Sequence, residues 1–238
     1  MRCVIIWLES MMEKTHDNAL ILFARDPVLG KVKTRLSPFL ADDVILNLYT
    51  CFLQDSLDNI GKVENVDRFV GVAPSNESGF FTGTLGSDIR MFVQGGESLG
   101  DKMRRAIQDR FAEGYERVVI IGSDSPSLPV PYLYRALGSE KDMVLGPSTD
   151  GGYYLIGMRG KVVEVFKDVT WGTETVLQET CERLVKNDAS LELLPVWYDV
   201  DTPEDLKFFK THLDLIEKAG LEASGETGKL LNKILSSH

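Results

Sequence analysis

Short apolar runs recur along the chain and alternate with longer segments in which apolar residues repeat with helical spacing. Short runs bounded by turn-forming residues are typical of buried strands. They predict strands at 19–24, 69–73, 89–93, 118–121, 143–145, 153–158 and 191–196. The helical spacing predicts helices at 41–60, 98–113, 132–137, 173–186 and 203–218. The segment 76–86 is rich in Gly, Ser and Thr, and we expect it to be a loop.

The strand predicted at 118–121 is the centre of this pattern. Its residues are an unbroken run of β-branched side chains, which is typical of a strand covered on both faces in a parallel sheet. Gly122 and Ser123 end the run, and Asp124 follows at the carboxyl end of the strand. Ligands of open α/β sheets bind at that edge, so Asp124 is a candidate functional carboxylate. The alternative is that Asp124 only caps a turn.

The order of the elements predicts the fold class. Alternating strands and helices in the first half predict right-handed βαβ units on a mainly parallel sheet. The closely spaced strands at 143–145 and 153–158 predict an antiparallel departure, so we expect an α/β protein with three layers (helices, mixed sheet, helices). No break in composition marks a second domain. We expect one domain at 19–219, a leader of uncertain role at 1–18 and a tail at 220–238.

Charge and composition argue against several kinds of partner. The 238 residues include 36 acidic and 26 basic ones, and the net charge of −10 argues against nucleic acid or an anionic membrane as a partner. The three cysteines are scattered without a CxxC pair, which predicts neither a disulfide framework nor a zinc site. No apolar run approaches the ~20 residues that span a bilayer. We expect a soluble, cytoplasmic protein, and the sequence leaves its oligomeric state open.

Three common signatures of nucleotide-binding and hydrolytic enzymes are absent or incomplete. The loop after the first strand contains no G-x-G-x-x-G. Gly95 and Gly100 have the spacing of a P-loop, but Asp101 stands where a lysine is required. The sequence GSDSP at 122–126 resembles a nucleophile elbow, yet its central residue is an aspartate and not a serine. A bound phosphate would therefore have to be held in another way.

The loop after the first strand concentrates positive charge. Its one acidic residue is Asp26, and its basic residues are Arg25, Lys31, Lys33 and Arg35. A basic loop in an acidic chain suits a polyphosphate ligand. If the loop is extended, side chains at 31, 33 and 35 point to the same side, and Gly30 lets the backbone approach a ligand closely. The alternative is a solvated basic turn.

Six motifs occur in an order and spacing that resemble one bacterial family. They are LILFARDPVLGKVKTRLSP, SLGDKM, IIGSDSPSLP, LGPSTDGGYYLIGM, WGTETVL and DVDTPEDL, and they cover roughly residues 19–210. That family, long labelled a domain of unknown function, is assigned as glycosyltransferases with a GT-A-like (nucleotide-diphospho-sugar transferase) fold. It is similar to the guanylyltransferases of molybdenum cofactor and of 2-phospholactate. SLGDKM departs from the more usual LGERM, and Lys102 lacks the bidentate fork of the arginine it replaces.

The resemblance implies roles for individual residues. Gly30, Lys33 and Arg35 resemble the loop that holds nucleotide phosphates in such transferases. Asp124 resembles the aspartate that binds a divalent ion, Mg²⁺ or Mn²⁺, and takes part in catalysis. An ion held by one or two carboxylates and by substrate phosphates would neutralise the leaving phosphate. The further residues that we assign to nucleotide binding are Arg25, Gln94 and Gly100.

A second metal ligand is predicted near the end of the domain. Asp199-Val200-Asp201 has the D-x-D form of many glycosyltransferase metal motifs. The DVDTPEDL motif of the family is also similar to the second metal position of the guanylyltransferases, which makes Asp201 the candidate ligand. The alternative is that Asp201 and Thr202 only mark a helix start, with Pro203 at its first position.

The segment DGGYY at 150–154 is a candidate site for a sugar or an acceptor. Its glycines allow unusual backbone angles, and its aromatic rings can stack on a sugar or a base. Asp150 is a candidate general base for an acceptor hydroxyl. The residues that we assign to substrate binding are Gly151, Gly152, Tyr153, Tyr154 and Trp171. The alternative is a hairpin turn with ordinary core tyrosines.

These assignments favour a metal-dependent transferase that acts on a nucleotide-activated donor and a small-molecule acceptor. Glycosyl transfer from a nucleotide-diphospho-sugar is preferred, because an acid and aromatic rings suit a sugar pocket. One alternative is nucleotidyl transfer of the guanylyl or cytidylyl type, with release of pyrophosphate. Another is a non-catalytic nucleotide-binding protein of the same fold.

Overall fold

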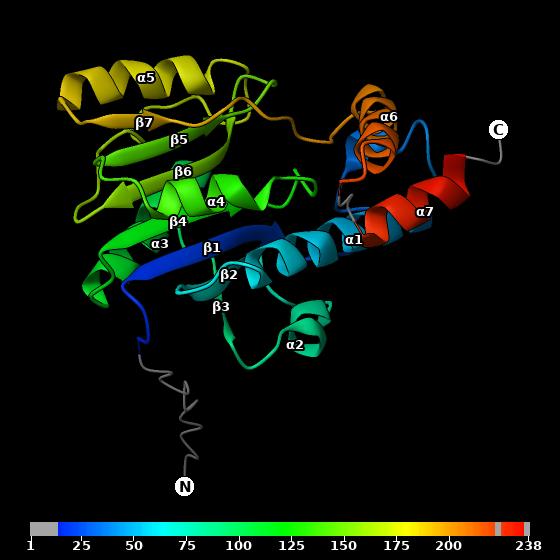
Figure 1. Ribbon diagram of the computed structural model, residues 1–238, viewed down its shortest axis with the longest axis horizontal. Coiled ribbons are helices and arrows are strands. Elements are labelled where there is room, and N and C mark those ends of the chain that lie inside the picture. Colours follow the sequence, from blue (N-terminus) through cyan, green and yellow to red (C-terminus); the bar gives the residue numbers. More distant parts are fainter. Residues whose placement is uncertain (1–13, 222–224, 236–238) are drawn as a thin grey trace, which may run out of the picture.

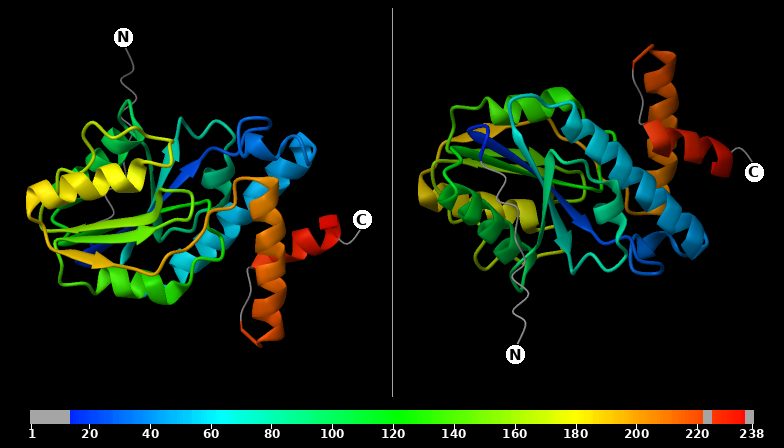
Figure 2. Two further views of the ribbon diagram at one scale, coloured as in Figure 1. Left: turned by 90° about the horizontal axis from the view of Figure 1, so that it is seen from above. Right: turned by 90° about the horizontal axis from the view of Figure 1, so that it is seen from below.

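Within the residues that the structure describes, seven strands form one sheet with helices on both of its faces (Figures 1 and 2). The computed structural model describes residues 14–221 and 225–235. The strands are β1 (Asn18–Arg25), β2 (Asp67–Ala73), β3 (Ile89–Val93), β4 (Arg117–Gly122), β5 (Met143–Pro147), β6 (Tyr153–Arg159) and β7 (Leu191–Leu193). The helices are α1 (Asp42–Gly61), α2 (Phe80–Thr84), α3 (Leu99–Ala112), α4 (Val130–Leu137), α5 (Val176–Asn187), α6 (Pro203–Lys218) and α7 (Gly225–Leu235). A 3-10 turn, η1, covers Thr34–Leu36.

The sheet is mixed and mainly parallel, which confirms the predicted fold class. Its strand order is β3-β2-β1-β4-β6-β5-β7, so β4 lies at the centre. Strand β1 is parallel to β2 and β4, and β2 is parallel to β3. Strand β6 is antiparallel to both β4 and β5, which is the predicted departure, and β5 is parallel to β7. As a result, the amino end of β6 and the carboxyl end of β4 meet at the same edge.

Two apolar cores lie on opposite faces of the sheet because successive strand residues point to opposite faces. Leu20 and Leu22 of β1 belong to the core that is covered by α1, α4 and α6. Ile21 and Phe23 belong to the core that is covered by α3 and α5. Figure 2 shows α4 and α5 on opposite sides of the sheet. Every strand at the centre is thus buried on both sides, as its continuous apolar run predicts.

Several element boundaries differ from the predictions. The expected loop at 76–86 contains the short helix α2, because Phe81 is fully buried and anchors this turn against the sheet. Helix α5 begins at Val176 and not at residue 173. The last strand is shorter than the predicted 191–196 and ends at Leu193. In the described part of the chain, no helix is both long enough and apolar enough to cross a membrane.

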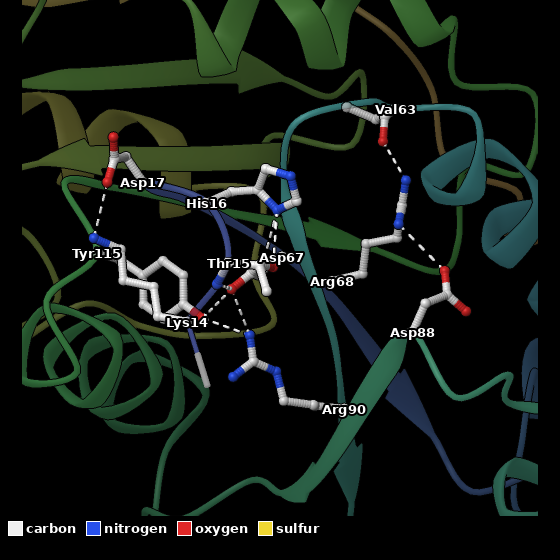
Figure 3. A network of polar contacts seen from close by, with 10 residues as sticks. All are labelled: Lys14, Thr15, His16, Asp17, Val63, Asp67, Arg68, Asp88, Arg90 and Tyr115. Carbon is white, nitrogen blue, oxygen red and sulfur yellow. Dashed lines mark hydrogen bonds and ion pairs between the residues drawn. The ribbon is translucent and has the colours of Figure 1, made fainter. Parts of the chain in front are cut away.

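A polar network ties the chain before β1 to the amino ends of the neighbouring strands (Figure 3). The buried Asp67, at the start of β2, accepts hydrogen bonds from the backbone of Thr15 (2.9 Å) and from the Tyr115 hydroxyl (2.6 Å). The Asp67 carboxylate also pairs with Arg90 (2.7 Å) and contacts His16. The end of the predicted leader therefore packs onto the sheet, while its residues 1–13 lie outside the described residues.

The predicted tail contains helix α7, which lies against α1 and α6 (Figure 1). Asp55 of α1 supplies its N-terminal cap, since the Asp55 carboxylate accepts hydrogen bonds from the backbone nitrogens of Glu226 (2.8 Å) and Thr227 (3.0 Å). These bonds satisfy donors that have no partner inside the helix. Residues 222–224 and 236–238 of the predicted tail lie outside the described residues.

Candidate active site

A cleft of about 910 Å³ opens at the carboxyl ends of β1, β2, β3 and β4. This is the edge at which open α/β sheets bind ligands. The predicted site residues that line the cleft are Arg25, Lys33, Arg35, Gln94, Asp124, Asp150, Gly152, Tyr153, Tyr154, Trp171 and Asp201. The predicted site residues that are not among its lining residues are Gly30, Gly100 and Gly151.

Lys33 joins two acidic side chains that are far apart in the sequence. Its Nζ atom forms an ion pair with Asp124 Oδ1 and another with Asp201 Oδ1, the latter at 2.7 Å. The Lys33 side chain is only 4% exposed, whereas the carboxylates of Asp124 and Asp201 are 45% and 34% exposed. The ammonium therefore lies beneath two carboxylates that remain open to the cleft.

The two acids meet because the segment after β7 returns to the end of β4. The backbone nitrogen of Val200 donates a hydrogen bond to the Asp124 carbonyl oxygen at 2.9 Å. In an extended segment the side chains flanking Val200 point to one side, so Asp199 and Asp201 both face the cleft. One backbone contact thus positions three carboxylates.

Charge balance keeps the Lys33 ammonium protonated. Burial by itself lowers the pKa of a lysine, but the adjacent carboxylates of Asp124 and Asp201 outweigh this effect and raise the pKa of Lys33 above its ordinary value. The Lys33 Nζ atom also lies 5.5 Å from the centre of the Phe52 ring. The lysine is therefore a fixed positive charge at the floor of the cleft.

The basic loop is not extended, so the predicted alternation of its side chains is wrong. Gly30 has a φ of 69°, Lys33 has a φ of 45°, and η1 follows directly. The resulting turns direct Lys33 inward, while the Arg35 side chain stays 70% exposed, with Nη1 3.9 Å from Asp201 Oδ2. Gly30 shapes this turn instead of lining the cleft.

Helix capping does not account for Asp201. Helix α6 begins with a capping box in which the Thr202 hydroxyl accepts a hydrogen bond from the Asp205 nitrogen, and Asp205 Oδ2 accepts one from the Thr202 nitrogen. The Asp201 carboxylate takes no part in these bonds and is paired with Lys33 instead. The interpretation as a helix cap therefore applies to Thr202 and Asp205, and the interpretation as a site carboxylate applies to Asp201.

Asp199 is a site carboxylate that our sequence analysis did not assign. It lines the cleft and accepts a hydrogen bond from the Ser125 hydroxyl. Burial raises the pKa of Asp199 to about 7, and the nearby charges of Asp124 and Asp150 add to the effect. The D-x-D spacing contained the signal, because residues two apart in an extended segment face the same side.

The 150–154 loop contributes one acid and one aromatic wall. Asp150 Oδ1 accepts hydrogen bonds from the Ser148 hydroxyl and from the Gly152 nitrogen (2.9 Å), and neither of these bonds engages Oδ2. Tyr153 and Tyr154 belong to opposite cores. The Tyr154 ring is 3% exposed and its hydroxyl donates to the Pro195 carbonyl, so the expected pair of stacking rings is not formed.

Two of the predicted glycines act through packing. The backbone of Gly100 is buried against Trp171, and an added Cβ would lie within 3.0 Å of the indole ring. Gly151 has a φ of 88°, and an added Cβ would collide with the backbone of Glu174. The Gly151 carbonyl also accepts a hydrogen bond from the Leu177 nitrogen at 2.8 Å. These glycines allow the 171–177 segment to pack closely against the cleft wall.

The other end of the cleft is formed by β1, β2 and β3. The Gln94 amide nitrogen donates to the carbonyls of Gly71 (2.7 Å) and Ala24 (3.3 Å), which fixes this side chain across three strands. The Tyr49 hydroxyl accepts from the Arg25 nitrogen at 2.9 Å and lies 3.1 Å from the Ser123 hydroxyl. These bonds fix the Gln94 and Tyr49 side chains, and Lys102 of α3 also lines the cleft.

The arrangement of Asp124 and Asp201 is compatible with a divalent ion. Both carboxylates already bind one cationic group, Lys33, through one oxygen each. No cluster of three His, Cys, Asp or Glu ligands exists within the described residues. Magnesium sites that are completed by substrate phosphates need only one or two carboxylates, so this donor set fits such an ion.

The fold is that of the nucleotide-diphospho-sugar transferase structures. The chain is similar, with a TM-score of 0.84 and 32% sequence identity, to a "putative nucleotide-diphospho-sugar transferase from Desulfovibrio desulfuricans G20". The similarity covers 93% of this chain and 96% of that one. A 4-diphosphocytidyl-2C-methyl-D-erythritol synthase from Anaerococcus prevotii DSM 20548 matches with a TM-score of 0.53 and 12% identity, over 84% of this chain and 96% of that one. The latter similarity shows the fold alone.

The chain belongs to the DUF2064 family, described as an uncharacterized protein conserved in bacteria, which matches residues 56–173. No curated protein matches the chain. The family assignment agrees with the resemblance that the six sequence motifs indicate.

Proposed function

We propose that this protein is a metal-dependent glycosyltransferase that uses a nucleotide-diphospho-sugar donor. The observation that carries the proposal is the meeting of Lys33, Asp124 and Asp201 at one point of the cleft. A lysine and two carboxylates at the carboxyl ends of β1 and β4 suit a diphosphate that arrives with a divalent ion.

The donor would lie along the cleft with its nucleoside toward Gln94 and its phosphates at the basic loop. Arg25 and Arg35 line this part of the cleft, and the exposed Arg35 guanidinium can form charge-assisted bonds with phosphate oxygens. Asp124 and Asp201 would hold Mg²⁺ or Mn²⁺ together with the phosphates. When bound, the ion neutralises the negative charge that develops on the departing diphosphate.

Asp150 is placed to act on the acceptor. Its Oδ1 atom is held by Ser148 and Gly152, and Oδ2 is available to take a proton. In the proposed step the acceptor hydroxyl oxygen bonds to the anomeric carbon of the sugar, the bond from that carbon to the phosphate oxygen breaks, and the hydroxyl proton passes to Asp150. Tyr153 and Trp171, which pack edge to face at 6.4 Å, form the wall beside it.

A second candidate is nucleotidyl transfer, and one observation favours it. Asp124 and Asp201 both pair with the Lys33 ammonium, so the two carboxylates lie close together. Two carboxylates at one point suit an ion that covers an α-phosphate. We prefer sugar transfer because of the 32% identity to the Desulfovibrio protein and because an acid and an aromatic wall lie beyond the carboxylate pair.

The products distinguish the two reactions. Purified protein would be incubated with a panel of nucleotide sugars and, separately, nucleoside triphosphates, each with a mixture of small acceptors and with Mg²⁺ or Mn²⁺. Release of a nucleoside diphosphate that requires the ion and is lost in Asp124→Asn supports sugar transfer. Release of pyrophosphate from a triphosphate, with no diphosphate from any nucleotide sugar, would replace it with nucleotidyl transfer.

A further inference from the structure

We propose that the Lys33 ammonium is a built-in cation that neutralises the Asp124–Asp201 pair in the free protein and is displaced when a divalent ion binds. This inference rests on the metal site of the proposed function. It adds a regulatory step to that site: the free protein resists divalent ions, and the ion enters as the lysine leaves.

The geometry places the two cations in competition for the same oxygen atoms. The Lys33 Nζ atom contacts Asp124 Oδ1 and lies 2.7 Å from Asp201 Oδ1, so it takes the oxygen atoms that an ion bridging the two acids would use. An ion held by the same two oxygens would be within a few ångströms of the ammonium, where like charges repel strongly. An ion that bridges the two acids through these oxygens must therefore displace the ammonium.

The lysine is held in place by more than its charge. Its side chain is 4% exposed and packs on Phe52, with Nζ 5.5 Å from the ring centre. Its backbone has a φ of 45°, a left-handed conformation that costs a lysine free energy and persists only where the surroundings enforce it. The lysine is therefore built into the pair, unlike a surface lysine that finds an acid by chance.

The neighbouring basic residues are not equivalent to Lys33. Lys31 lines the same cleft from the same loop, but it is exposed, and the cation that pairs with both acids is Lys33. Removing either lysine changes the net charge of the protein equally. Only removal of Lys33 leaves Asp124 and Asp201 without their shared cation, so Lys31 provides a matched control.

The consequence is coupling between the ion and the donor. In the free protein, an ion must compete with an ammonium that is already in place, so its affinity is weak. Phosphates that arrive with the ion offer new acceptors to the released ammonium, which lowers the cost of its displacement. The ion and a nucleoside diphosphate should therefore each tighten the binding of the other by the same factor.

The test is the affinity of the protein for Mn²⁺ without any nucleotide, measured by electron paramagnetic resonance of the unbound ion. Lys33→Met, which removes the charge and keeps most of the length of the side chain, should bind Mn²⁺ about tenfold more tightly or better than the wild type. Lys31→Met should change the affinity by less than about twofold. Melting curves with and without Mn²⁺ check folding, and Lys33→Gln replaces Lys33→Met if the latter does not fold.

Two results would overturn the proposal. One is an unchanged Mn²⁺ affinity in folded Lys33→Met, which would mean that the lysine does not compete with the ion. The other is an equal gain in Mn²⁺ affinity in Lys31→Met, which would mean that the effect comes from the overall charge of the protein. Neither result depends on turnover, so this inference can fail while ion-dependent sugar transfer by the wild type stands.

Discussion

Two glycines beside the cleft offer a matched pair of substitutions that tests how the wall around Asp150 is built. Gly151 and Gly172 have similar left-handed backbones, with φ of 88° and 82°. An added Cβ at Gly172 would meet no atom within 4 Å, whereas at Gly151 it would collide with the backbone of Glu174. Replacing each by alanine therefore imposes the same backbone strain, and only Gly151→Ala adds a collision.

The expected magnitudes follow from these two contributions. A left-handed alanine costs about 1–2 kcal/mol of unfolding free energy, and this is the full effect expected for Gly172→Ala. A collision with backbone cannot be relieved by a rotamer change, so Gly151→Ala should lose about 1–3 kcal/mol more. For a domain of this size the added loss lowers the melting temperature by several degrees, at about 2–4 °C per kcal/mol.

Chemical denaturation and melting curves of both variants would measure the difference. Relief of the collision also moves the 171–177 segment, because the Gly151 carbonyl accepts a hydrogen bond from Leu177. We therefore expect binding of the substrate to weaken in Gly151→Ala more than in Gly172→Ala. Equal stability of the two variants would refute the proposed packing of Gly151 on Glu174.

Three further predictions concern carboxylates with different roles. Asp124→Asn and Asp201→Asn should each reduce turnover by about hundredfold or more through loss of the ion; an active Asp124→Asn enzyme would contradict the metal site. Burial alone would raise the pKa of Asp67, but hydrogen bonds from neighbouring side chains and backbone hold this pKa well below its ordinary value. Asp67 therefore stabilises the protein above about pH 4, and this stabilisation is lost as the pH falls further. Asp67→Asn should therefore lower stability at pH 7 and flatten its loss in acid, as denaturation at several pH values would show; an unchanged pH profile would contradict this. Asp55→Ala should lower the free energy of unfolding by about 1–2 kcal/mol and increase hydrogen exchange in α7, because it removes the cap of that helix. Unchanged hydrogen exchange in α7 would count against the cap.

The fold could be predicted from the sequence to a large extent because local patterns determine it. The apolar run at 118–121 and the acid after it place β4 at the centre and Asp124 at its carboxyl end. The short spacing around 143–158 predicts the antiparallel strand β6. The helix α2 was missed because its stability comes from the burial of Phe81 and not from a helical pattern.

The candidate site was less predictable because its geometry depends on contacts between distant segments. The pairing of Lys33 with Asp201 joins residues 168 positions apart, and it follows from a turn that no local pattern reveals. Gly100 and Gly151 carry the marks of ligand-binding glycines, yet their space is taken by Trp171 and Glu174. The sequence predicted that Tyr153 and Tyr154 together stack on a ligand, but successive residues of a strand point to opposite faces of the sheet, and so do these two rings.

The most direct test of the central claim is the melting temperature of the protein with a panel of nucleoside diphosphates, each with and without Mg²⁺ or Mn²⁺. We expect at least one nucleotide, present at about a hundred times its Kd together with the ion, to raise the melting temperature by about 5–10 °C. Replacing Arg25 and Arg35 by alanine should weaken binding about tenfold or more for each residue and remove most of the rise, without altering the Lys33 contact to the two acids. No rise with any nucleotide, or an equal rise in the double variant, would contradict a phosphate site at this cleft.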